Sequence, residues 1–76
     1  MRYFFNIRDA RGVIRDEEGM ELADPTAAHD AALASARDIV MEDINAGATL
    51  VARWIEVADE KGRVLKSVYV LDATKS

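Results

Sequence analysis

The chain has 76 residues, a formal net charge of −4, a hydrophobic content of 50% and no cysteine. This length fits one small domain, and the lack of cysteine excludes disulfides, thiolate metal sites, iron–sulfur clusters and cysteine nucleophiles. No apolar run approaches the roughly 18 residues of a membrane span, and the start is too short and too alternating for a signal peptide. We therefore expect a cytoplasmic protein without a membrane segment.

The first strand is expected at the start of the chain, where RYFFNIR alternates apolar and polar side chains. This alternation places Phe4 and Arg8 on the face opposite Tyr3, Phe5 and Ile7. The turn sequence DARG and a short returning strand follow, which together predict a hairpin. The next segment, EEGMELA, fits either a third strand or a docked loop, and the sequence does not separate the two.

A long helix is predicted from about residue 25 to residue 46. Asp24 suits the N-cap, Pro25 suits the first helical position, and Gly47 suits the left-handed residue after the last turn. A step of about 100° per residue gives the helix an apolar, alanine-rich half. The residues on this half are His29, Ala32, Leu33, Ala36, Ile39, Val40, Ile44 and, at its edge, Asp43.

Two further strands are expected after the helix, joined by the turn sequence DEKG. In the first, 51–58, Ile55 and Val57 face one side, Trp54 faces the other, and Arg53 shares the Ile55 side at the strand's open end. The second strand, 64–71, is apolar on both faces. Residues 72–76 are expected to form a frayed tail.

These elements predict a single α+β domain over residues 1–76, with the order strand, strand, helix, strand, strand. One helix covers only one face of an antiparallel sheet of about four strands, so the other face is left open. An open apolar face indicates a binding partner, and self-association is the simplest one for so small a core. The predicted interaction surface consists of Phe4, Arg8, Arg53, Trp54, Lys66, Val68 and Val70.

The phrases RYFFNIRD, IRDEEGMEL, SARDIVMED and IEVADEKGRVL resemble an uncharacterised family of short bacterial domains, domain of unknown function 6894. The resemblance covers nearly the whole chain, RDEEGMEL is its most specific part, and it implies no activity or site residues. A fainter similarity is to HicB-type antitoxin domains, in which Asp16, Glu18, Gly19 and Asp24 would be the matching positions. That similarity implies an antitoxin-like regulator, although the chain lacks the proline-containing strand usual after the helix in those domains.

Ligand-type side chains concentrate in the acidic segment Asp16–Asp24, with His29 one turn into the helix. Several carboxylates suit Mg²⁺ or Ca²⁺, but the spacing is not that of an EF-hand loop, and a solvated acidic loop is the simpler explanation of the segment. A metal-dependent hydrolase at this segment is one hypothesis. His29 could act as a general base, although its place on the apolar half favours a packed histidine.

No nucleophile elbow, nucleotide-binding glycine motif or distinctive carboxylate pair is present, so we expect no cofactor and no enzymatic activity. The leading hypothesis is a non-catalytic module that binds a protein partner or a second copy through the open sheet face or an edge strand. The alternative is a small nucleic-acid-binding regulator, in which Arg8, Arg15, Arg53 and Lys66 lie among Phe4 and Trp54. The sequence pI of about 4.8 argues against this alternative.

Overall fold

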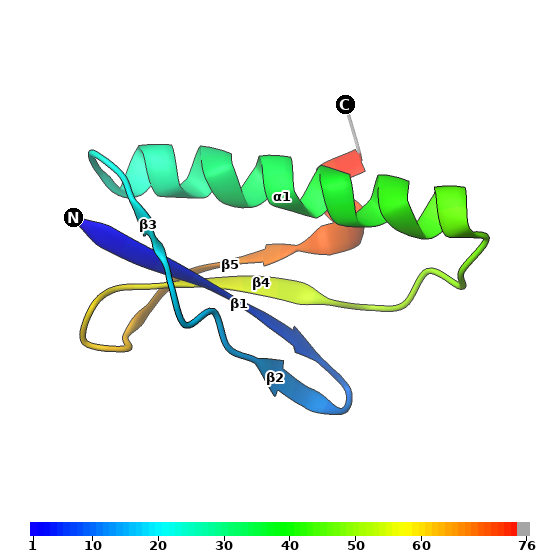
Figure 1. The fold of residues 1–76 in the computed structure, drawn as a ribbon, viewed down its shortest axis with the longest axis horizontal. Helices are drawn as coiled ribbons and strands as arrows, with labels where there is room; N and C mark the ends of the chain where they lie inside the picture. Colours follow the sequence, from blue (N-terminus) through cyan, green and yellow to red (C-terminus); the bar gives the residue numbers. More distant parts are fainter. Residues whose placement is uncertain (75–76) are drawn as a thin grey trace.

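The computed structural model describes residues 1–74 and has two layers, in which one helix lies along one face of an antiparallel sheet (Figure 1). This arrangement confirms the predicted α+β fold. The elements in chain order are β1 (Arg2–Asp9), β2 (Gly12–Ile14), β3 (Met20–Glu21), α1 (Pro25–Ala46), β4 (Trp54–Ala58), β5 (Val64–Tyr69) and the 3₁₀ helix η1 (Val70–Thr74).

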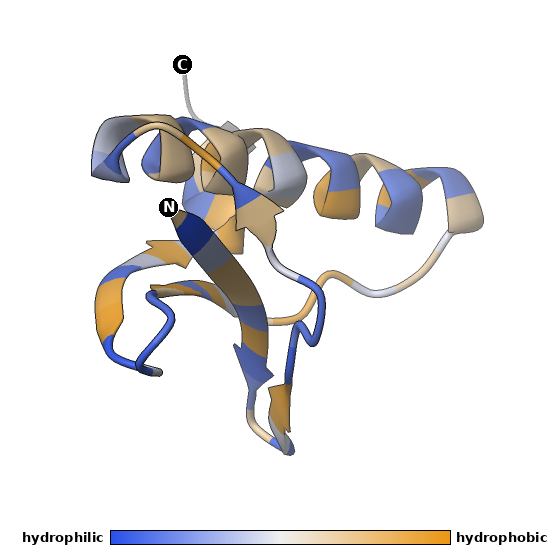
Figure 2. Ribbon diagram, turned by 60° about the vertical axis from the view of Figure 1, so that its left-hand side comes forward, coloured by the Kyte–Doolittle hydropathy of each residue, from blue (hydrophilic) through white to orange (hydrophobic). Residues whose placement is uncertain are grey.

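The main path of the sheet has the order β2-β1-β4-β5, and all neighbouring strands are antiparallel. The central strand β1 carries both hydrophilic and hydrophobic residues along its length (Figure 2), and its neighbouring residues point to opposite faces. β2 pairs with the end of β1, whereas β3 pairs with its start. The ambiguous EEGMELA segment thus contributes a two-residue strand, and the remainder of it is loop.

The helix occupies the predicted range because both of its ends have local caps. The side chain of Asp24 accepts a hydrogen bond from the N–H of Ala27 at 2.8 Å, and Pro25 follows as the first helical residue. At the other end, Gly47 has a φ of 69° and donates its N–H to the carbonyl of Ile44. Within residues 1–74 no helix combines the length and apolar character needed to cross a membrane.

The core lies between a row of small helix residues and the inner face of the sheet. Ala28, Ala32, Ala36 and Val40 are four residues apart and fully buried, so the helix presents a narrow face that allows the sheet to approach closely. The buried sheet-side partners, which include residues from β1, β4, β5 and η1, are Tyr3, Ile55, Val57, Val68, Val70 and Ala73.

Two details of the predicted helix face are wrong. Ala28, not His29, belongs to the buried row, and His29 lies beside it with its side chain half-buried. Ile44 is 56% exposed, because the last turns of α1 lie over the connector to β4 and not over a strand (Figure 1). The apolar half was therefore predicted one residue off centre and one turn too long.

The end of the chain also differs from the prediction. β5 stops at Tyr69, and residues Val70–Thr74, expected as strand and frayed tail, form η1 against α1. Val70 and Ala73 are buried, and the guanidinium of Arg37 donates to the carbonyl of Ala73 at 3.2 Å. Burial of these two side chains explains why the segment is ordered. The last two residues of the predicted tail, 75 and 76, lie outside the described residues.

Candidate functional site: the open sheet face

The face of the sheet away from α1 is built from the outward-facing residues of β1, β4 and β5. In a paired antiparallel sheet, directly opposite residues share a face, so the register identifies this surface. Three cross-strand rows result: Arg8–Trp54–Tyr69, Asn6–Glu56–Ser67 and Phe4–Ala58–Val64. We call these nine residues the open face.

An aromatic pair dominates one end of the open face. The rings of Trp54 and Tyr69 have centroids 5.1 Å apart and are inclined by 39°. Trp54 is 38% exposed and Tyr69 is half-buried, so the pair offers apolar surface to the solvent. A tilted aromatic pair at this distance buries part of each ring against the other and leaves apolar surface exposed, which suits a contact surface.

The charges on the open face are paired with each other. The guanidinium Nε of Arg8 lies 2.9 Å from a carboxylate oxygen of Glu56, and Glu56 is the less exposed partner. The centre of the face is thus polar but has no net charge. This arrangement favours contact with protein groups over contact with a phosphate backbone, which requires unpaired cations.

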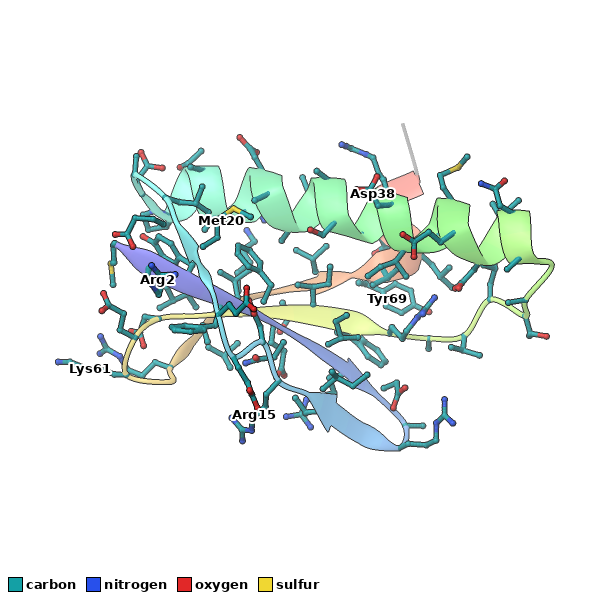
Figure 3. All side chains as sticks on the ribbon, in the orientation of Figure 1. Arg2, Arg15, Met20, Asp38, Lys61 and Tyr69 are labelled. Carbon is teal, nitrogen blue, oxygen red and sulfur yellow. The ribbon has the colours of Figure 1, made fainter. Side chains whose placement is uncertain are left out.

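A shallow hollow of about 230 Å³ lies at the other end of the open face. It is bounded by Phe4, Asn6 and Ala58, by the loop from Arg15 to Glu17, and by the β4–β5 turn. Figure 3 shows Arg15 on the side of the sheet away from the helix and Lys61 extending outward from the β4–β5 turn. The hollow therefore continues the open face between two polar loops.

Asp16 folds the loop beside this hollow. Its carboxylate accepts hydrogen bonds from the backbone N–H groups of Phe5, Gly19 and Glu18 at 3.1, 3.1 and 3.2 Å. Burial raises the pKa of this carboxyl, but the hydrogen bonds from Phe5, Gly19 and Glu18 outweigh that effect and lower the pKa below its ordinary value. The carboxylate of Asp16 thus accepts a backbone N–H of β1 in the gap between β2 and β3, where no strand lies beside this edge of β1 in residues 1–74.

Gly19 completes the same loop. Its φ is +71°, and a Cβ at this position would lie 2.9 Å from the carbonyl oxygen of Tyr3 and 2.9 Å from the ring of Phe4. Only glycine avoids both the backbone strain and these contacts. Asp16 and Gly19, two residues of the RDEEGMEL phrase, therefore have structural roles in this fold.

The second polar loop is the β4–β5 turn, which is held by Asp59. Its buried carboxylate accepts from the backbone N–H groups of Lys61 and Arg63 and from the Arg63 guanidinium, each at 2.9 Å. The N–H of Arg63 is the main cause of the lowered pKa of Asp59, which the nearby guanidinium lowers further. Asp59 thus fixes the turn in its ionised form.

The structure brings together only part of the predicted interaction surface. Phe4, Arg8 and Trp54 lie on the open face, as predicted. Val68 and Val70 do not, because they are 5% and 0% exposed and pack beneath α1. For these two valines, the predicted placement on the uncovered side is wrong.

The two remaining predicted residues also lie elsewhere. Arg53 forms an ion pair with Asp43 of α1, so its side chain is on the helix side of the sheet. Lys66 is directly opposite the buried Val57, which places Lys66 on the helix side as well, at the exposed rim. The four bases of the nucleic-acid hypothesis are therefore divided between the two faces.

The prediction missed Tyr69 and Val64 as members of the open face. Both faces of β5 are apolar, so the alternation of its residues does not show which face meets the helix. Trp54 could have provided the signal, because its direct neighbour in the hairpin shares its face. However, the β-bulge between Val57 and Ala58 shifts the register by one residue. Counting residues outward from the β4–β5 turn therefore does not identify Tyr69 as the residue opposite Trp54.

The acidic segment does not form a metal site within residues 1–74, where no group of three histidine or acidic side chains is placed to hold an ion. Asp16 is engaged by backbone N–H groups, and Glu21 forms an ion pair with the N-terminal amine at 3.0 Å. In the part of the chain that the structure describes, His29 Nδ1 is buried without a hydrogen-bond partner, as is Arg53 Nε. Neither atom has a cluster of ligand groups around it.

Comparison with known proteins gives one match. The family model described as Domain of unknown function (DUF6894) matches residues 2–71, which include β1 to β5 and the start of η1. Searches of curated proteins and of solved structures found no significant match. The family match includes the Asp16–Gly19 loop, the capped helix and the row Arg8–Trp54–Tyr69 of the open face. The chain therefore belongs to the family described as Domain of unknown function (DUF6894).

Proposed function

We propose that this domain is a non-catalytic, cytoplasmic interaction module that binds a protein through its open face, either a different protein or a second copy. The observation that carries the proposal is the aromatic pair of Trp54 and Tyr69 on a sheet face that no element covers in residues 1–74. Tryptophan and tyrosine are the side chains that contribute most often to the energetic centre of protein interfaces.

The polar part of the open face supports the same function. Arg8 and Glu56 neutralise each other, and Asn6 and Ser67 add uncharged polar groups in the same region, although Asn6 Oδ1 already accepts the N–H of Asp16 at 2.9 Å. A protein partner that covers this face removes Trp54 from water, and polar groups of the partner can form hydrogen bonds with the polar side chains of the open face. This combination of an apolar anchor and a polar surround is common in protein interfaces.

The alternative function, a nucleic-acid-binding or antitoxin-like regulator, has less support. A stacking surface for single strands needs aromatic side chains beside unpaired cations. Trp54 and Tyr69 supply aromatic groups, but Arg8 is paired with Glu56, and Arg53 is paired with Asp43 on the other side of the sheet. Nucleic acid therefore stands as the outcome that the test must distinguish from protein.

The test compares wild-type protein with Trp54→Ala in affinity capture from the native lysate and in solution mass. Met41→Ala is the matched control, because Met41 is also apolar and 54% exposed but lies on α1. We expect Trp54→Ala to lose the captured protein or the self-association, with an unchanged circular dichroism spectrum, and Met41→Ala to retain both. Capture is expected to survive nuclease treatment.

Unchanged capture and mass in Trp54→Ala would overturn the proposal. Recovery that disappears on nuclease treatment and declines steeply with salt would support the nucleic-acid alternative instead. In that case Arg8→Gln is the variant to measure, because Arg8 is the cation in the row Arg8–Trp54–Tyr69.

A further inference from the structure

The outer edge of β5 is a strand edge without a neighbour. Within residues 1–74, β5 pairs with β4 alone and ends the main path of the sheet. Its first four residues, Val64 to Ser67, are all exposed. Unpaired strand edges offer a row of backbone donors and acceptors to another strand.

The hydrogen bonds to β4 show which backbone groups of β5 point outward. Val70 donates its N–H to the carbonyl of Arg53 at 2.9 Å. Bonding alternates along an antiparallel strand, so Val68 also bonds to β4, whereas Ser67 directs its N–H and C=O, and Tyr69 its N–H, away from it. The C=O of Tyr69 lies at the start of η1, where it accepts the first bond of that helix. The outward groups form the free part of the edge.

The opposite edge of the sheet is closed to such pairing. There β1 is already matched by β2 at one end and β3 at the other. Between them, the carboxylate of Asp16 accepts the N–H of Phe5 at 3.1 Å. The two edges thus differ, and β5 is the edge with unused backbone groups, centred on Ser67.

We propose that β5 pairs antiparallel with β5 of a second copy of this chain, with the two Ser67 residues opposite each other on a two-fold axis. The two Ser67 residues then exchange a pair of backbone hydrogen bonds across the axis. The two sheets become one continuous sheet, with both helices on the same side.

The register follows from symmetry and charge. In an antiparallel pair, directly opposite residues lie on the same face of the sheet. A two-fold axis perpendicular to the sheet must therefore pass between one residue and the same residue of the second copy. Registers centred on Lys66 and Ser67 give the longest overlaps of β5. A Lys66 centre brings two ammonium-bearing side chains directly opposite each other, which is unfavourable. A Ser67 centre avoids this, because Lys66 then faces the partner's Val68.

A second copy fits this edge better than an unrelated strand because the proposed register also extends the open face. It places the partner's Leu65 opposite Tyr69, so the row Arg8–Trp54–Tyr69 continues into the second copy. Leu65 is 46% exposed in the single chain, and the pairing gives it an aromatic neighbour. Aliphatic–aromatic pairs of this type stabilise adjacent strands.

This inference deepens the proposed function, since it names a second copy as one partner, but it depends on the strand edge and not on the Trp54 ring. The experiment measures solution mass by analytical ultracentrifugation over a range of protein concentrations. We expect wild-type protein to reach the dimer mass. A wild-type protein that stays monomeric at the highest concentration would overturn the inference.

Ser67→Pro removes the outward N–H at the centre of the pairing. The N–H of Ser67 does not bond to β4, so the fold should tolerate proline at this edge position. We expect a monomer with an unchanged circular dichroism spectrum, and a folded Ser67→Pro dimer would overturn the inference.

A charge exchange tests the register without changing the backbone. Ser67→Asp and Ser67→Lys each place like charges across the axis, so each variant alone should be monomeric where wild-type protein is dimeric. An equimolar mixture of the two variants should recover the dimer, because opposite charges then face each other. Ser35→Asp, on the exposed outer side of α1, is the control and should remain dimeric.

Failure of the mixture to recover the dimer would overturn the Ser67-centred pairing. That failure is distinguishable from failure of the proposed function. The open face is tested by capture with Trp54→Ala. The edge pairing is tested by recovery of the dimer mass when the two Ser67 variants are mixed, a result that the loss of an open-face contact at Ser67 cannot produce.

Discussion

The two faces of the sheet have opposite constructions. The centre of the covered face meets a helix row of alanines and carries buried aliphatic and aromatic residues, such as Ile55 and Val57. The open face carries the half-exposed pair of Trp54 and Tyr69 beside an ion pair. Apolar side chains at the centre of the first face therefore stabilise the fold, whereas Trp54 on the second face remains 38% exposed to solvent.

The largest effect on stability is expected from Ile55→Ala, next in sequence to Trp54 but on the covered face. Removing this buried side chain should lower the free energy of unfolding by about 2–5 kcal/mol, because a cavity replaces it. Trp54→Ala should cost less despite the larger side chain, since Trp54 is 38% exposed. Urea denaturation of both variants measures the difference, and an equal or reversed order would contradict the comparison.

The close approach of α1 to the sheet can be tested with Ala32→Leu. Ala32 is 0% exposed, so a leucine must push the two layers apart, and we expect a loss of about 1–3 kcal/mol in unfolding free energy. Ala34→Leu, on the exposed side of the same helix, is the matched control and should change stability by less than about 0.5 kcal/mol. Thermal and urea unfolding measure both variants. A neutral Ala32→Leu would show that the layers are not closely packed.

The loop beside the open face depends on the ionised carboxylate of Asp16. Asp16→Ala leaves the N–H groups of Phe5, Gly19 and Glu18 without this acceptor, and we expect a loss of about 1–2 kcal/mol at neutral pH, at the lower end because water reaches the loop. Urea denaturation at pH 7 checks this value. A variant as stable as wild-type protein would contradict the role assigned to Asp16.

The pH dependence of the same loop has a definite sign. Folding lowers the pKa of Asp16 below its ordinary value of 3.8, so the ionised form favours the folded state. This contribution is fully present above pH 3.8 and is lost as the pH falls through the lower folded-state pKa. The stability difference between wild-type protein and Asp16→Ala should therefore shrink on acidification, and urea denaturation as a function of pH measures it. A difference that grows toward low pH would contradict this account.

The smallest effect is expected for the ion pair on the open face. Arg8 is 51% exposed at its side chain, so Arg8→Gln should change unfolding free energy by only about 0.2–1 kcal/mol. Its effect should decrease further at high salt, because solvent screens exposed charges. Urea denaturation at low and high salt checks this result, and a loss as large as that of Ile55→Ala would place Arg8 in the core of the fold.

The sequence predicted those parts of the fold that depend on local signals. Asp24, Pro25 and Gly47 determine the ends of the helix through contacts within a few residues, and the alternation in β1 and β4 assigns Phe4 and Trp54 to the open face. Long-range choices were not predictable in the same way. The orientation of β5 depends on a bulge and on packing against α1.

The structural role of Asp16 could not be predicted from its neighbours in the sequence, because it also depends on long-range contacts. Its carboxylate bonds to Phe5, which is 11 residues away, and this contact exists only after β1 and the loop meet. The segment therefore resembled a metal-binding cluster in the sequence, whereas in the fold its first residue completes a strand edge. Similarly, the isolated ligand-type residue His29 is adjacent to the buried row and belongs to no cluster in residues 1–74.

The fluorescence of Trp54 tests directly whether a partner binds at the open face. Trp54 is the only tryptophan in the chain, so its emission reports on this face without a label. The measurement titrates the protein captured by the wild-type domain and follows the emission wavelength and quenching by acrylamide. We expect the emission of Trp54 to shift to shorter wavelength, and its quenching by acrylamide to decrease, as the complex forms. Complex formation detected by mass, with emission and quenching of Trp54 unchanged, would contradict it.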